Sequence, residues 1–413
     1  MGSQPELHIV IVGGGIAGLA TAFALRHPGR RITVLERSRL LREVGALISL
    51  QPNASKIVNN WNLDSFLEKT EPLVDRAFRM FDADGKCVRE LPLEKGQFGA
   101  DRILYHRQDL QAALGDAATS EHANGRPVQI RTASQVVAVD CYEGVVTLES
   151  GERIHGDVII GADGIHSVVR TVVLGEEKSA LPTGTSAYRL LLPIESLESL
   201  SFPEKLLNPQ DPSTTMIMGH DRRVIMGPGR GTKLYGIVAL VPDENLAEKS
   251  SDNWVSPGSI DKLLEAYSDF PTWLHEIFRA APDVALWQLR DIDPLPRWVR
   301  GRTILIGDAA HAMLPTQGQG ASQSFEDAEA LQAFLSEVES RDQVGAALDR
   351  VFAARYDRAT LIQKFSREQA KPATDGTTRE IKLDPAQFMK YNCDYDGAAD
   401  WEDRQKKGIA KPR

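Results

Sequence analysis

The first 36 residues have the apolar pattern of a strand, a helix and a second strand. A short apolar run at His8–Val12 precedes a cluster of glycines, and a helical stretch follows at Leu19–Arg26. The next run, Arg31–Glu36, is rich in β-branched residues and ends in an acid. Two strands separated by a helix form a βαβ unit, so the chain is predicted to begin with a parallel sheet.

Further along, short strand-like runs replace the helical period. Val136–Val139 and Val145–Leu148 flank a Glu-Gly turn and predict a hairpin, while Asp157–Ile160 and Arg302–Ile306 predict buried strands. Between residues 186 and 241 several such runs occur without a long helix, which predicts an antiparallel sheet in a second domain. The clearest runs there are Thr215–Met218, Arg223–Met226 and Leu234–Leu240.

Helical patterning returns after this region. It predicts helices at Ile260–Tyr267, at Thr272–Ala280, at Ser322–Ser336 and at roughly 342–368. The last forty residues are polar, and we expect that tail to be partly ordered at best.

The 413 residues are too many for one hydrophobic core and suit two to three domains. We expect an α/β fold in which a Rossmann-like nucleotide-binding domain is discontinuous and takes residues 1–75, 101–178 and 290–340. We expect residues 76–100 and 179–289 to form an inserted antiparallel-sheet domain for the substrate. Residues 341–413 would then form a C-terminal helix and a polar tail.

Composition and charge narrow the partners that this chain is expected to have. The formal net charge of −9 and the pI near 5.6 argue against a broad basic surface for nucleic acid. No window has the 18 or so uninterrupted apolar residues that a membrane helix needs. The cysteines, Cys87, Cys141 and Cys393, are too far apart in sequence to form a metal or redox motif. We therefore expect a cytoplasmic monomer or homodimer that binds neither nucleic acid nor a membrane.

The glycine cluster is typical of a dinucleotide site. In Gly13-x-Gly15-x-x-Gly18 the first glycine permits a tight turn, the second lets the backbone approach a pyrophosphate, and the third lets the helix pack on the strand. Glu36, eighteen residues beyond Gly18, is placed to bind a ribose, and its charge would repel a 2′-phosphate. A glycine-rich turn in an unrelated fold is the alternative, and this motif alone does not separate FAD from NAD.

Further segments carry a family resemblance. They are Tyr105–Leu110 (YHRQDL), Gly161–Arg170 (GADGIHSVVR) and Gly307–Pro315 (GDAAHAMLP), the last followed by Gln317–Ala321 (QGQGA). In order and spacing they resemble the single-component FAD-dependent aromatic monooxygenases, which include salicylate and para-hydroxybenzoate hydroxylases. The segments Glu43–Ala46 and Gln51–Asn53 make the likeness closest to the salicylate-hydroxylase-like branch.

This resemblance implies a fold, cofactors and a reaction. The fold would be a Rossmann-like FAD-binding domain of the para-hydroxybenzoate hydroxylase type, with an inserted antiparallel-sheet substrate domain and C-terminal helices. FAD would accept hydride from NADH or NADPH, react with O2 and, as a C4a-hydroperoxide, hydroxylate a small aromatic substrate. NAD(P)H would bind only transiently, since there is no second fingerprint: Gly227–Gly231 contains a proline and predicts a turn.

The same resemblance, with the fingerprint, supplies candidate cofactor-binding residues. Asp308, at a strand end, would bind a ribityl or ribose hydroxyl or would cap a helix, and Asp163 would serve the dinucleotide groove or cap a turn. Arg107 would contact the flavin or be a surface cation. The helix that opens after Gly318 would stabilise negative charge on the reduced flavin. The full set is Gly13, Gly15, Ala17, Gly18, Glu36, Arg37, Gly45, Ala46, Arg107, Asp163, Asp308, Gly318, Gly320 and Ala321.

Tyr188 and Arg189 are the catalytic candidates. Related hydroxylases place a catalytic arginine in this segment, and a buried arginine would favour the anion of a phenol; a structural salt bridge is the alternative for Arg189. The chain departs from some relatives by having Met226 where they have a tyrosine, and Thr316 where an aromatic residue or histidine is usual. The substrate therefore stays open. Other readings are a flavin-dependent epoxidase or dearomatising hydroxylase of secondary metabolism, and a flavin-binding protein without catalysis.

Overall fold

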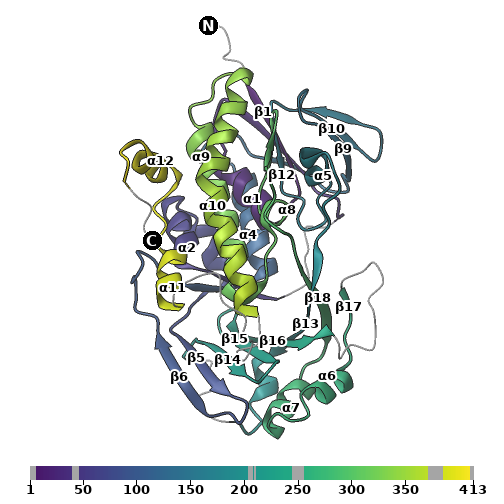
Figure 1. The fold of residues 1–413 in the computed structure, drawn as a ribbon, viewed down its shortest axis with the longest axis vertical. Coiled ribbons are helices and arrows are strands. Elements are labelled where there is room, and N and C mark those ends of the chain that lie inside the picture. Colours follow the sequence, from purple (N-terminus) through teal and green to yellow (C-terminus); the bar gives the residue numbers. More distant parts are fainter. Residues whose placement is uncertain are drawn as a thin grey trace.

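The computed structural model describes residues 6–39, 46–202, 208, 211–243, 255–370 and 385–409. Its two main sheets lie in opposite halves of the molecule, one in the upper and one in the lower half of Figure 1. Gly45, one of the candidate cofactor residues, lies outside the described residues.

The upper half is built on a six-stranded sheet with the order β19-β20-β12-β1-β2-β8. The central strand β1 pairs in parallel with both β2 and β12, and α1 (Ile16–Ala24) connects β1 to β2, which confirms the βαβ unit. All residues of β1 are buried, as expected for a parallel strand covered on both faces. The strands are β1 (Leu7–Val12), β2 (Arg30–Leu35), β8 (Gln129–Arg131), β12 (Val158–Gly161), β19 (Val299–Arg300) and β20 (Thr303–Leu305).

Helices and two small sheets complete this half. The predicted hairpin is confirmed as β9 (Val136–Asp140) and β10 (Val145–Leu148), which β11 (Arg153–His155) extends to three strands. A second small sheet contains β3 (Leu47–Leu50), β7 (Ile103–His106) and β4 (Leu73–Val74). The main helices are α2 (Pro52–Asn60), α4 (Arg107–Thr119), α5 (Val168–Leu174), α8 (Asp308–His311), α9 (Gly320–Leu335) and α10 (Val344–Ala370).

The lower half is an eight-stranded sheet with the order β17-β18-β13-β16-β15-β14-β5-β6. It is antiparallel as predicted, except that β14 pairs in parallel with β5, a strand from an earlier part of the chain. The sequence interpretation of Gly227–Gly231 as a turn is wrong for residues 227–229, which end β15; the turn is at Arg230 and Gly231, both with positive φ. The strands are β5 (Ala77–Asp82), β6 (Cys87–Pro92), β13 (Leu181–Pro193), β14 (Thr214–Met218), β15 (Arg223–Gly229), β16 (Leu234–Pro242), β17 (Val255–Pro257) and β18 (Val284–Asp291).

The two faces of this sheet have different neighbours, because successive side chains point to opposite faces. One face carries Tyr188 and Met226 and packs under α6 (Ile260–Ala266) and α7 (Thr272–Arg279). The other packs against Leu314 from the upper half. We call this second face the inner face; it carries Ala187, Ile225, Val238, Leu240 and Trp287.

The end of the chain has more structure than its polar composition predicts. Residues 385–409 include α11 (Pro385–Cys393) and α12 (Ala398–Lys406), with Phe388 and Ala398 fully buried. A few apolar side chains at the right positions are enough to dock both helices. No helix among the described residues is long and apolar enough to cross a membrane.

A buried group of charges joins α9 to α10. Arg355 is fully buried; its guanidinium donates to Asp327 at 3.0 Å and pairs with Glu326. Glu326 also accepts from Asn53 at 2.6 Å, and Asp327 accepts from the Gly307 amide at 2.9 Å. Two acids on one helix are thus balanced by an arginine on the next, and each acid also holds a neighbouring segment in place.

We expect Arg355→Ala to lower the free energy of unfolding by about 3–5 kcal/mol, because Glu326 and Asp327 would stay buried after losing the cation that they share. The control is Arg350→Ala on the same helix: Arg350 pairs with Glu337 and Glu402 near the surface, and its loss should cost about 0–1 kcal/mol. Urea unfolding of both variants at saturating cofactor measures the difference. Equal losses would show that the buried pair has no special role in stability.

Candidate active site

The glycine turn after β1 has the close contacts that its sequence predicts. Gly13 has φ +109°, and a Cβ there would lie 2.3 Å from the Ala162 carbonyl oxygen. A Cβ on Gly18 would lie 2.0 Å from the carbonyl oxygen of Gly13, so only glycine lets α1 approach the turn. Gly15 is the N-cap of α1. The first amides of α1 therefore follow directly on a turn that can sit against a phosphate.

Glu36 lies beside this turn. Its carboxylate accepts hydrogen bonds from the Gly14 amide at 2.7 Å and from the Ser38 amide at 2.8 Å. The acid at the end of β2 and the glycine turn at the end of β1 are therefore in contact, as binding of one dinucleotide by both requires. The next residue, Arg37, is exposed.

The Arg107 segment reaches the same region from α4. The Arg107 amide donates to the Ala46 carbonyl at 2.8 Å, which brings together two residues predicted to contact the flavin. One turn later, Gln111 donates its side-chain amide to the Gly14 carbonyl at 2.8 Å. Within the described part of the chain the buried side-chain oxygen of Gln111 has no hydrogen-bond partner. Sequence reasoning missed Gln111, although it lies four residues after Arg107 on the same helix face.

Asp163 holds the turn that leads into α5, whose N-cap is Ser167, and this agrees with the turn-capping role, one of its two expected roles. Its carboxylate accepts from the Ser167 hydroxyl and from the amides of Val168 and Val169 at 2.8 and 3.1 Å. Burial raises the pKa of Asp163 even though these hydrogen bonds oppose the shift. Contact between Asp163 and a dinucleotide stays a prediction.

Asp308 is exposed and does not cap α8. The N-cap is Gly307, with φ +55°, and the Asp308 carboxylate makes no hydrogen bond to any residue that the structure describes. A Cβ on Gly307 would lie 2.9 Å from the Cβ of Ala17, so the end of β20 packs directly on the start of α1. Asp308 therefore offers an unused acceptor next to the glycine turn.

The start of α9 forms another side of the site. Gly318 has φ +60°, and a Cβ there would lie 3.0 Å from the side-chain nitrogen of Gln51. A Cβ on Gly320 would meet nothing within 4 Å, so space lies next to the first turn of the helix. The helix begins at Gly320, two residues earlier than predicted, and Ala321 is in its first turn. Its 16 residues place a partial positive charge at this end.

On the substrate side, alternation along β13 separates the two catalytic candidates. Tyr188 is 1% exposed and lies in the core under α6 and α7, so it cannot contact a ligand on the inner face, and we withdraw its catalytic role. Met226 lies in the same core, and Ile225 occupies the inner face instead. Met226, which stands where some relatives have a tyrosine, therefore points away from the inner face. The strands on which both residues lie were predicted, but not which side chains face inward.

Arg189 belongs to the inner face. Its guanidinium carbon lies 4.4 Å from the ring centre of Trp287, an attractive cation–π contact. A pocket on the same face is lined by both apolar and polar residues, which are Leu240, Leu289, Leu314, Ala370, Thr185, Thr316, His220, Asp221 and Arg223. Thr316, which stands where an aromatic residue or histidine is usual, is part of the wall of this pocket. Its hydroxyl donates to the Ser366 carbonyl at 2.7 Å.

These groups fit FAD. The open space at Gly320 leaves room for a bound molecule, and Asp308 and Gln111 offer acceptors that the described chain does not use. No cluster of three or more His, Cys, Asp or Glu that could hold a metal occurs among the described residues.

Comparisons with known proteins agree with this fit. The family model described as FAD binding domain matches residues 104–366, and the model for FAD dependent oxidoreductase matches residues 8–46. FAD-dependent monooxygenase cfoG of Aspergillus candidus is 33% identical over 89% of this chain and 86% of its own. 3-Hydroxybenzoate 6-hydroxylase 1 of Aquipseudomonas alcaligenes is 32% identical over 87% and 88%. A solved salicylate hydroxylase substrate complex has a TM-score of 0.79 at 28% identity, with 100% of each chain covered.

We expect Asp308→Ala to lower the FAD content of the purified protein while the fold is kept, because one charge-assisted hydrogen bond is worth about 1.5–3 kcal/mol. The control is Glu121→Ala, which removes another exposed acid far from the glycine turn in sequence. The flavin-to-protein absorbance ratio, measured after dialysis against limiting FAD, compares the two. Full occupancy in Asp308→Ala would remove Asp308 from the cofactor site.

Proposed function

The chain belongs to the single-component FAD-dependent aromatic monooxygenase family, and from that premise we propose that it hydroxylates an aromatic or phenolic substrate with NAD(P)H and O2. One oxygen atom would enter the ring and the other would leave as water, with two electrons supplied by NAD(P)H. The observation that carries the proposal is the position of Arg189 on the inner face, above Trp287.

Arg189 would stabilise the substrate as it gains phenolate character. The arginine stays protonated throughout the physiological range, so it offers a permanent charge that favours an anion over the neutral phenol. Contact with Trp287 limits where the guanidinium can lie, and a charge already in place needs no reorganisation during reaction.

Apolar side chains on the inner face would limit the access of water near Arg189. Leu240 and Leu289 come from the sheet and Leu314 from the loop that leads to α9, and all three are buried. Where such side chains exclude water, the interaction of Arg189 with an anion would be stronger, because the effective dielectric constant is lower than in water.

The flavin, when bound, supplies hydride acceptance and oxygen activation. Residues of the upper half would hold it: Glu36 at a ribose, Asp308 at a ribityl or ribose hydroxyl, and the amides at Gly320 and Ala321 near the pyrimidine edge of the ring. The charge on Glu36 disfavours a 2′-phosphate on the resident nucleotide. NAD(P)H would visit only for reduction.

We propose that one half of the molecule binds the cofactor and the other binds the substrate. Residues 1–75, 101–178 and 290–340 would form the cofactor domain, and residues 76–100 and 179–289 the substrate domain. The membership of β5 and β6 in the eight-stranded sheet supports the assignment of residues 76–100 to the substrate side.

We expect Arg189→Ala to keep FAD bound, because the residue is on the substrate sheet, and to reduce hydroxylation about 10²–10³-fold, the loss typical of one preorganised electrostatic donor. NAD(P)H should still be consumed slowly, with H2O2 formed in place of product. Product per NAD(P)H oxidised, from chromatography and nicotinamide absorbance with a panel of phenols and indoles, measures this.

Two further variants sharpen this experiment. Arg189→Lys keeps the charge but loses the planar fork, so partial rescue would indicate a point charge and no rescue a bidentate contact. Arg297→Ala removes an exposed arginine and should change nothing. An unchanged rate and ratio in Arg189→Ala would leave Arg189 a structural role only. An epoxide or dearomatised product would replace aromatic hydroxylation by the alternative chemistry of the same family.

A further inference from the structure

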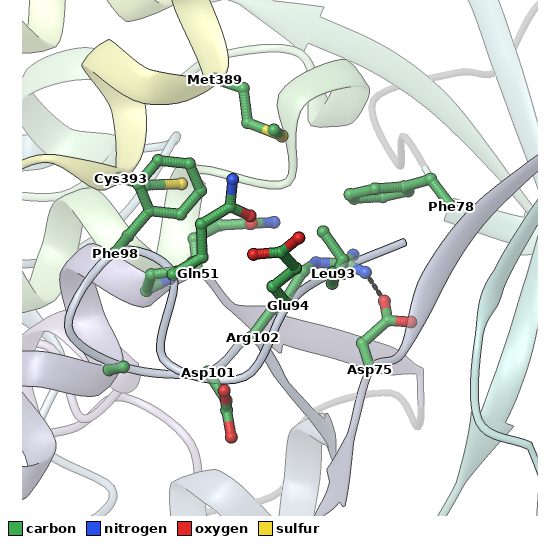
Figure 2. Close-up of a pocket in the computed structure, with 13 residues that line it drawn as sticks. Gln51, Asp75, Phe78, Leu93, Glu94, Phe98, Asp101, Arg102, Met389 and Cys393 are labelled. Atoms are coloured by element: carbon green, nitrogen blue, oxygen red, sulfur yellow. Dashed lines mark ion pairs between the residues drawn. The ribbon is translucent and has the colours of Figure 1, made fainter. Parts of the chain in front are cut away.

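A second pocket lies on the cofactor side of the sheet and includes residues from the end of the chain (Figure 2). Phe78 of β5 and Phe98 contribute aromatic rings, Gln51 lies just before α2, and Met389 and Cys393 come from α11. Figure 2 shows the Gln51 amide pointing into the space between Phe78 and Met389. The side-chain nitrogen of Gln51 donates to Ser49 at 3.3 Å, while its side-chain oxygen accepts from no described residue.

This pocket adjoins the region where the flavin is expected. Gln51 lies against Gly318, and the adjacent Asn53 donates to Gln319 at 3.1 Å. Arg102, on another wall, donates to Ser49 of β3 at 3.0 Å and to Thr214 of β14 at 2.7 Å, so it ties the cofactor half to the sheet. A ligand in the pocket would therefore lie beside the loop that opens α9.

Phe78, which lines this pocket, lies on the same face of the eight-stranded sheet as Arg189. Directly paired residues share a face, and the pairs Arg189–Val238, Val238–Ile225, Ile225–Met216 and Met216–Met80 run from β13 across the sheet to β5. Phe78, two residues before Met80, therefore lies on the inner face as well. Four strand spacings separate β13 from β5, which is about 19 Å. A single ring cannot contact both ends of this face.

The wall that α11 provides is fixed to the protein core. Arg358 donates to the carbonyls of Tyr391 and Asn392, both at 2.8 Å, and so satisfies the end of the helix. The same guanidinium pairs with the buried Glu326 at 2.7 Å. On the other side of α11, Phe388 stacks on Phe365. Because α11 is held at both points, Met389 is presented at a defined position.

We propose that this pocket is a second compartment of the substrate site, that it takes the distal ring of an extended aromatic substrate between Phe78 and Met389, and that Met389 determines specificity by limiting the size of that ring. The inference rests on the proposed function. The thioether of methionine contacts aromatic rings favourably, and the side-chain oxygen of Gln51 would accept from a hydroxyl or ring N–H on the distal ring. Met389 is a specificity-determining residue here and has no part in the reaction itself.

The test compares two probes on the FAD-loaded enzyme: 3-hydroxybenzoate, with one ring, and 4-hydroxy-p-terphenyl, whose three rings in line are long enough, with a contact at either end, for a separation of about 19 Å. Met389→Trp fills the compartment, so it should weaken binding of the three-ring probe about tenfold or more and leave 3-hydroxybenzoate within about twofold. Met389→Ala should remove the ring contact and weaken the three-ring probe alone, by a few-fold. The matched control is Lys390→Ala, an exposed neighbour on α11 that pairs with Asp394. Calorimetric Kd values and probe-stimulated NAD(P)H oxidation are measured together.

The outcomes separate the two proposals. Equal effects of Met389→Trp on both probes, or none on either, with FAD content and Tm unchanged, would overturn the second compartment while hydroxylation stands. If neither probe binds the wild-type enzyme or stimulates NAD(P)H oxidation, the proposal of phenol hydroxylation is contradicted, and the second compartment, which rests on it, is contradicted with it. A size preference that changes in Lys390→Ala as much as in Met389→Trp would also contradict the specific role of Met389.

Discussion

The arrangement of the cofactor region depends on the buried ion pairs between α9 and α10. Arg355 sits between Glu326 and Asp327 with no exposure to water, and Arg358 also pairs with Glu326, so these buried charges are tolerable only because opposite charges lie beside them. Burial alone would raise the pKa of Asp327, but its interactions with His311 and Arg355 lower it to about 2. Asp327 is therefore ionised when it accepts from the Gly307 amide, one residue before Asp308. The position of a candidate FAD ligand is thus set by an electrostatic requirement in the core.

A second constraint brings the two halves into contact at β3. A Cβ on Gly229 or Gly236 would lie 2.4 or 2.6 Å from side-chain atoms of Leu47, so a larger residue at either position would force Leu47 to move as β3 approaches β15 and β16. Glycine within a strand often marks such a close approach of another segment. Ala46, which accepts from the Arg107 amide, immediately precedes Leu47. The glycines of the eight-stranded sheet therefore help to place a segment of the candidate cofactor site.

The sequence predicted the parts of the site that depend on local chemistry. The turn at Gly13 and the adjacent Glu36 could be located because glycine at positive φ and an acid at a strand end leave a signal within a few residues. The sequence could not predict which face of the sheet carries Tyr188 and Met226. Strands of this sheet such as β16 are buried on both faces, so apolar and polar residues do not alternate along them. The polar background of the C-terminal segment likewise concealed α11, whose docking depends on Arg358 and on partners distant in sequence.

Glu326 links the candidate cofactor region to α11, so that a displacement of one would disturb the other. Its carboxylate pairs with Arg355, accepts from Asn53 beside Gln51, and pairs with Arg358, which holds the last carbonyls of α11. All of these partners bind the same two oxygens, which are buried from solvent, so none can move far without leaving a buried charge unsatisfied. The distance between α2 and α11, which sets the width of the pocket at Gln51 and Met389, is therefore fixed by the same acid that orders α9. A change in substrate size achieved by moving α11 would disturb the cofactor loop, whereas a change in the side chain at position 389 would not. Replacing the side chain at position 389, with α11 held in place, would therefore change the size of substrate that the pocket accepts without disturbing flavin binding.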